Sequence, residues 1–129
     1  MWPPAVRVTG EVLISPRVDS FRSATLHVAL EDVGRVNAPA QLLAEAAVPG
    51  VSHIGAQGSG TRVPFEIRSY PDTSEPDPRG HYVVRAWIEG GSRSKSEDYL
   101  GSNESYPVLT RGFGSHVLIH IVCLGGSHE

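Results

Sequence analysis

The sequence contains a single cysteine, Cys123, a single methionine, and few aromatic residues, which make up 7% of its 129 positions. One cysteine cannot form an internal disulfide or supply the thiolates of a cysteine-based zinc site. The longest apolar run, residues 117–124, is interrupted by His120 and is far shorter than the roughly 18 residues that a membrane helix needs. These absences exclude a disulfide-stabilised scaffold and a membrane-spanning helix.

A surplus of basic residues is also absent. The chain has 11 Lys and Arg against 14 Asp and Glu, which gives a net charge of −3 and an isoelectric point near 6.0. Nucleic acids and anionic membranes are bound through a basic footprint, so neither is an expected partner. The start of the chain, MWPPAVRVTGEV, has neither the basic nor the apolar region of a secretory signal. We therefore expect a cytoplasmic protein as the chain stands, or an envelope protein if a signal peptide has been removed.

The sequence is rich in turn-forming residues, with 14 glycines and 10 prolines gathered between short apolar runs. A chain of this length forms one domain in most cases. We expect a single domain over residues 6–124, with a tail at 1–5 and another at 125–129.

The apolar runs alternate with polar residues at a period of two, which is typical of strands that bury one face. Pro64 removes a backbone donor from its run, which predicts an edge strand there. The pattern predicts an all-β fold, an antiparallel β-sandwich of about seven to eight strands in Greek-key order, similar to immunoglobulin and transthyretin folds. The clearest strands are expected at residues 6–14, 24–32, 62–69, 81–89 and 116–123.

Two segments are ambiguous in the sequence. Residues 40–48, AQLLAEAAV, are good helix formers, but Pro39 before them and Pro49-Gly50 after them favour a strand, so both alternatives stay open. Residues 98–109 indicate either a weak strand pair or a bent edge.

Several segments follow one another in a distinctive order along the chain: V-x-G-E-V, ATLHVALEDV, NAPAQLLAEAAVPG, RVPFEI, HYVVRAWI, YPVLTRG and SHVLIHIV. In order and pattern they resemble the YbaY/YscW-like family over residues 6–122. The resemblance implies a small β-sandwich and a binding or assembly-assisting role, since some members are envelope lipoproteins and others are pilotin-like chaperones that help an outer-membrane secretin to assemble. Asn37 stands where the family usually has Asp in its D-A-P-A signature.

The histidines are the first candidates for chemistry. His116 and His120 are four residues apart, which is about 13 Å on a strand, so they cannot share one metal ion there. We interpret the histidines as outward polar positions on half-exposed strands and expect no metal site and no cofactor. The six histidines are His27, His53, His81, His116, His120 and His128.

Outward positions of the later strands form the candidate binding patch. Exposed apolar side chains beside Arg and His are typical of a recognition surface. We expect this patch to be contiguous if the last strands share a sheet, and to bind a protein or peptide partner or a second copy of the chain. Its residues are Val83, Arg85, Trp87, Leu118 and His120. A second outward set, with mixed charges, is expected to be solvated; it consists of Arg7, Glu11, Thr25, His27, Glu31, Glu66 and Arg68.

An enzyme is the alternative interpretation. The sequence has no G-x-S-x-G nucleophile motif, and Cys123 falls on the predicted core face of its strand. A small cofactor-free isomerase, cyclase or hydrolase would need polar side chains gathered in one deep pocket at the mouth of the sandwich. The candidate catalytic residues are His81, Arg85, Tyr99, His116 and His120.

Overall fold

A computed structural model describes residues 6–34, 37–55, 60–68, 79–93, 100–102, 105–110 and 112–123. The residues within these ranges form strands and turns, with no helix among them. The strands are β1 (Arg7–Ile14), β2 (Phe21–Asp32), β3 (Gln41–His53), β4 (Thr61–Arg68), β5 (Tyr82–Glu89), β6 (Ser92–Arg93), β7 (Leu100–Ser102), β8 (Tyr106–Val108) and β9 (His116–Cys123).

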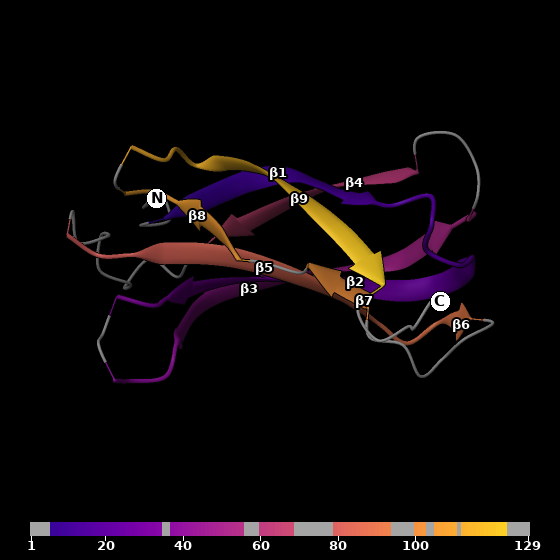
Figure 1. Ribbon diagram of the computed structural model, residues 1–129, viewed down its shortest axis with the longest axis horizontal. Helices are drawn as coiled ribbons and strands as arrows, with labels where there is room; N and C mark the ends of the chain where they lie inside the picture. The colour runs from indigo at the N-terminus through magenta and orange to yellow at the C-terminus, as the bar shows by residue number, and fades with distance from the viewer. Residues whose placement is uncertain are drawn as a thin grey trace, which may run out of the picture.

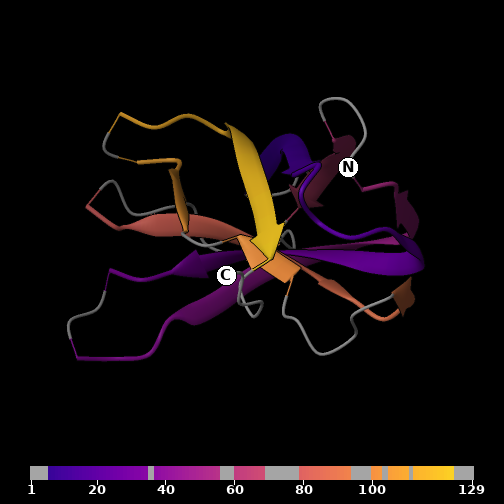
Figure 2. The same ribbon diagram turned by 45° about the vertical axis from the view of Figure 1, so that its right-hand side comes forward.

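The strands form two packed layers, which confirms the predicted all-β sandwich. The hydrogen-bonded order is β3-β2-β5-β7-β9-β1-β4, with β6 beside β2 and β8 beside β5. Figures 1 and 2 show β4, β1 and β9 in one layer and β3, β2 and β5 in the other, with β7 between β5 and β9. One pairing departs from the antiparallel prediction, because β1 and β9 run parallel. These two strands lie at opposite ends of the chain, so no hairpin sets their relative direction.

The core lies between the layers and is built by alternate side chains of each strand. In β1, Val8, Val12 and Ile14 are fully buried, while Thr9, Glu11 and Leu13, which alternate with the inward positions, are partly exposed. The inward positions of β9, Ile119 and Ile121, are fully buried as well. Because one face of each layer is apolar and the other is polar, the outer faces are the surfaces available to a partner.

Gly10 occupies an inward position of β1 where no side chain fits. It pairs with Phe65 of β4 on one side and with Val117 of β9 on the other. A Cβ atom at Gly10 would lie 2.0 Å from the carbonyl oxygen of Val117 and 2.9 Å from the Phe65 ring. The glycine therefore allows the two neighbouring strands to close over the core.

The structure resolves both ambiguous segments. Residues 40–48 lie in β3, which pairs with β2, so strand pairing overrides their helix propensity. The segment 98–109 contains the two short strands β7 and β8. Pro64 lies in β4 at one end of the strand order, which confirms the predicted edge strand. The expected exposure of Val83 is wrong: it is 6% exposed, because Glu31 of β2 and Pro107 of β8 face it from either side.

Candidate partner-binding surfaces

The predicted binding patch is divided between two surfaces. Trp87 lies on β5 and Leu118 on β9, in different layers, and β7 separates these strands. Gly101 of β7 faces Trp87 on one side and Val122 on the other. Leu118 is four residues from Val122, so it is about 13 Å along the strand and two strand spacings, about 10 Å, from Trp87. The expectation of one contiguous patch is therefore wrong.

The first surface, which we call the Trp87 surface, is the outer face of β2 and β5 formed by His27, Glu31, Arg85, Trp87 and Glu89. The strand register places His27 directly opposite Trp87. Their rings stack at a centroid distance of 5.3 Å with 14° between their planes. The Cζ atom of Arg85 lies 4.7 Å from the centre of the same indole, a cation–π contact. The half-buried Trp87 ring is thus held by a neighbour on its own strand and another on β2.

Two carboxylates fix the neighbours of the indole. Glu31 accepts a hydrogen bond from Arg85, with Nε and Oε2 3.1 Å apart. Nε2 of His27 lies 2.8 Å from Oε1 of Glu89. Ala29 is paired with Arg85 across the two strands. It is 1% exposed, although it occupies an outward position of β2, so this small residue is covered by its neighbours. The Trp87 surface is therefore a cross-strand ladder of interlocked side chains.

The second surface, which we call the β9 surface, is the outer face of β9 and of the adjoining strand β1. It presents His116, Leu118 and His120, which the register places beside Thr9, Glu11 and Leu13 of β1. Leu118 is 43% exposed, which makes it the most exposed large apolar side chain of the predicted patch. The backbone N–H of His120 donates to the hydroxyl of Tyr106 at 3.1 Å, which ties β9 to β8.

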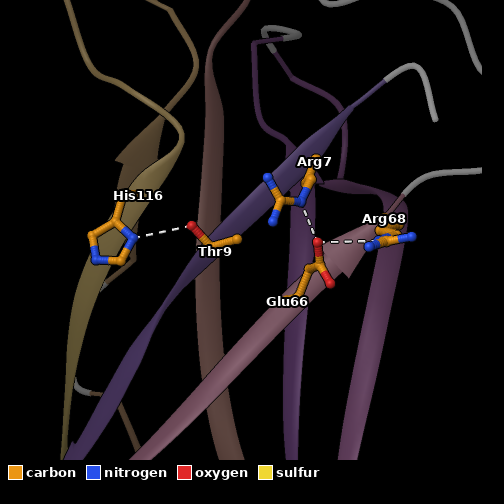
Figure 3. Close-up of polar contacts among 5 residues, drawn as sticks. All are labelled: Arg7, Thr9, Glu66, Arg68 and His116. Carbon is orange, nitrogen blue, oxygen red and sulfur yellow. Dashed lines mark hydrogen bonds and ion pairs between the residues drawn. The ribbon is translucent and has the colours of Figure 1, made fainter. Parts of the chain in front are cut away.

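A charged cluster extends the β9 surface toward β4 (Figure 3). Glu66 of β4 accepts hydrogen bonds from both Arg7 and Arg68, the latter at 3.1 Å. The Arg7 guanidinium holds the pKa of the Glu66 carboxyl below its ordinary value, and the Arg68 guanidinium contributes to the same lowering as the second cause. Beside them, Nδ1 of His116 is 3.0 Å from the Thr9 hydroxyl. The expected mixed-charge set is thus split as well, with Thr25, His27 and Glu31 on the other layer.

The alternative catalytic residues do not converge on one site in the part of the chain that the structure describes. Arg85 lies on the Trp87 surface, while His116 and His120 lie on the β9 surface, and His81 is an exposed residue before β5. Tyr99 falls outside the described residues. A hollow at the ends of β3 and β4 contains none of the candidates, since its lining is Leu42, Leu43, Ala44, Glu45 and Arg68.

His53 is the polar residue that sequence reasoning misplaced. It is 2% exposed, so the expected outward position is wrong for this histidine. Its Nδ1 lies 2.7 Å from the Thr61 hydroxyl and its Nε2 3.0 Å from the Val18 carbonyl oxygen. These contacts join the end of β3 to β4 and to the turn after β1, a structural role. The side chain of Cys123, which was expected on the core face, lies outside what the structure describes.

No helix among the described residues has the length and hydrophobicity to cross a membrane.

Comparison with known proteins adds two findings. Residues 3–121 match the YscW family, described as type III secretion system lipoprotein chaperones. The fold is similar to the structure of an alternative pilotin from the type II secretion system of Vibrio cholerae, with a TM-score of 0.69 and 22% sequence identity. That likeness covers 93% of this chain and 97% of the pilotin, and it shows a shared fold. A search of curated proteins gave no match.

Proposed function

Because the chain belongs to the YscW family of type III secretion system lipoprotein chaperones, we propose that it is a non-catalytic chaperone for a protein of a bacterial secretion system, and that the Trp87 surface contacts this client. The client that the family resemblance implies is the outer-membrane secretin. The family match over residues 3–121 supports the chaperone class, and the geometry of the Trp87 surface supports the choice of face.

The contacts that hold the Trp87 indole are the reason for choosing the Trp87 surface as the client-binding face. Tryptophan and arginine are the residues that most often dominate the energy of protein interfaces. Here the indole is stacked on His27 and contacted by Arg85, and each of these neighbours is bound to a carboxylate. A side chain that is already ordered loses less conformational entropy when a partner binds. The Trp87 surface is thus pre-organised for contact with a partner.

The β9 surface is the competing face for the same function. Leu118 has a larger exposed fraction than the half-buried Trp87, but an aliphatic side chain cannot be ordered by the ring-stacking and cation–π contacts that hold the indole. Its neighbours His116 and His120 are exposed. We therefore assign the main contact to Trp87 and treat Leu118 as the comparison in the experiment.

The experiment measures binding of the purified chain to the purified secretin of the same bacterium, together with secretin multimer yield when both are co-expressed. Trp87→Ala is expected to weaken binding at least about tenfold and to lower the multimer yield. Phe113→Ala, which removes a 49% exposed aromatic residue from a turn, is the matched control and should bind like the wild type.

Two outcomes would overturn the proposal. A folded Trp87→Ala variant with wild-type affinity, alongside a Leu118→Ala variant that binds weakly, would move the client to the β9 surface. A secretin whose multimer yield is the same with and without the chain would remove the chaperone role itself.

A further inference from the structure

The outer faces of the two layers carry opposite formal charge when histidine is neutral. On the face of β1 and β4 three arginines stand against two glutamates, whereas the paired segments 25–31 of β2, 44–47 of β3 and 85–89 of β5 carry three glutamates and one arginine. These residues are Arg7, Arg62, Arg68, Glu11 and Glu66 on the first face, and Glu31, Glu45, Glu89 and Arg85 on the second. The face that contains the Trp87 surface therefore favours a partner with a surplus of positive charge.

The two carboxylates of the Trp87 surface differ in how far they are open to a partner. The Glu31 side chain is 13% exposed and is bonded to Arg85, so its charge is already paired. The Glu89 side chain is 65% exposed and contacts His27 through Oε1. A carboxylate has about four acceptor sites, so Glu89 can accept further hydrogen bonds from a partner.

Glu45 adds a second open carboxylate on the same face. It lies on β3, where the strand register is regular and pairs it with Ala29 of β2, an outward position. Glu45 is exposed, and Arg68 of the other layer, which lines the same hollow, is bonded to Glu66. The acidic face thus presents Glu45 and Glu89 to solvent from two different strands.

The Trp87 indole lies between these two carboxylates. Glu89 is two residues from Trp87 along β5, which is about 7 Å. Glu45 is one such step in the opposite direction and two strands away, which is about 12 Å from Trp87 and about 16 Å from Glu89 between Cα atoms. The residues in the same row on the neighbouring strands are small, Ala47 of β3 and Gly101 of β7. The aromatic centre of the face is therefore flanked by small side chains and, on the diagonal, by two negative charges.

Resting on the proposed function, we propose that the segment of the client that docks on the Trp87 surface is basic and apolar. One apolar side chain packs on the Trp87 indole, and two Lys or Arg side chains, one on each side of it and about 16 Å apart, pair with Glu89 and Glu45. The carboxylates select the client and orient it, because an acidic segment is repelled from this face and the same basic segment is repelled from the face of β1 and β4.

Binding of the purified secretin to the full chain, measured at about 50 mM and about 300 mM salt, tests the two carboxylates. The wild type should bind more weakly at the higher salt, because exposed charge pairs are screened. Glu45→Lys should weaken binding at low salt at least about fivefold and reduce the salt dependence. Glu89→Gln keeps an acceptor for His27 while it removes the charge, and should weaken binding about two- to fivefold.

Asp19→Lys is the matched control, because it changes the net charge of the chain by the same amount as Glu45→Lys. Asp19 is exposed in the connection between β1 and β2, away from the Trp87 surface. This variant should bind the secretin like the wild type and keep its salt dependence. Circular dichroism establishes that each variant is folded.

A second experiment needs no secretin. Two synthetic peptides of equal length each carry one leucine, between two lysines in the first and between two glutamates in the second. Nuclear magnetic resonance follows the indole N–H of Trp87, which Trp87→Phe assigns. The lysine peptide should shift this resonance in a saturable way, and should do so less in Glu45→Lys, whereas the glutamate peptide should leave it unmoved.

The outcomes separate the partner chemistry from the chaperone role. Wild-type affinity of both Glu45→Lys and Glu89→Gln for the secretin, a lysine peptide that does not shift the indole resonance, or a glutamate peptide that shifts it equally would each overturn the basic and apolar partner. A secretin that fails to bind, beside a lysine peptide that does bind, would instead remove the secretin as the client and support the partner chemistry.

Discussion

Replacement of His53 by alanine should strongly destabilise the protein. The imidazole is 2% exposed and contacts two polar groups, the Thr61 hydroxyl at 2.7 Å and the Val18 carbonyl at 3.0 Å. It also packs against the Phe21 ring, with centroids 5.5 Å apart. Two hydrogen bonds contribute about 1 kcal/mol each, and the cavity left by a buried ring costs about 1–2 kcal/mol more. The free energy of unfolding should therefore fall by about 3–4 kcal/mol.

Thermal and urea unfolding, followed by circular dichroism, measure this loss. At about 4 °C per kcal/mol for a domain of this size, the midpoint should fall by about 12–16 °C. The control is His116→Ala, which removes an exposed histidine with one hydrogen bond to Thr9 and should change stability by at most about 0.5 kcal/mol. If the two alanine variants melt within about 4 °C of each other, His53 does not join β3 to the turn after β1 as the contacts indicate.

Two further changes test the packing and the electrostatics of the β1 layer. Gly10→Ala places a Cβ atom 2.0 Å from the Val117 carbonyl oxygen, so it should lower the free energy of unfolding by about 1–3 kcal/mol, measured by urea unfolding. An unchanged urea midpoint would contradict the close approach of β1 and β9. Glu66→Gln removes a carboxylate whose pKa is held below 4.5 by Arg7 and then by Arg68. Its stabilising effect is present above pH 4.5 and is lost as the pH falls through the lowered pKa, so wild type and variant should differ at pH 7 and converge in acid. A difference that persists at low pH would point to packing instead of charge.

The sequence predicted the elements whose signal is local. Alternation located the long strands, and Pro64 identified the edge strand β4, because a proline removes a ladder donor at a position that sequence alone reveals. The helix-prone residues 40–48 stayed ambiguous because their strand conformation depends on pairing with β2, which is formed by residues distant from the local pattern.

The candidate site was predicted only in part, for a related reason. Arg85 and Trp87 are outward on β5 as expected, but their contacts with Glu31 and His27 depend on the β2–β5 register. Leu118 was grouped with them because β5 and β9 come late in the chain, whereas β7 separates the two strands. Alternation gives the face of a residue and leaves its neighbours across the sheet undetermined.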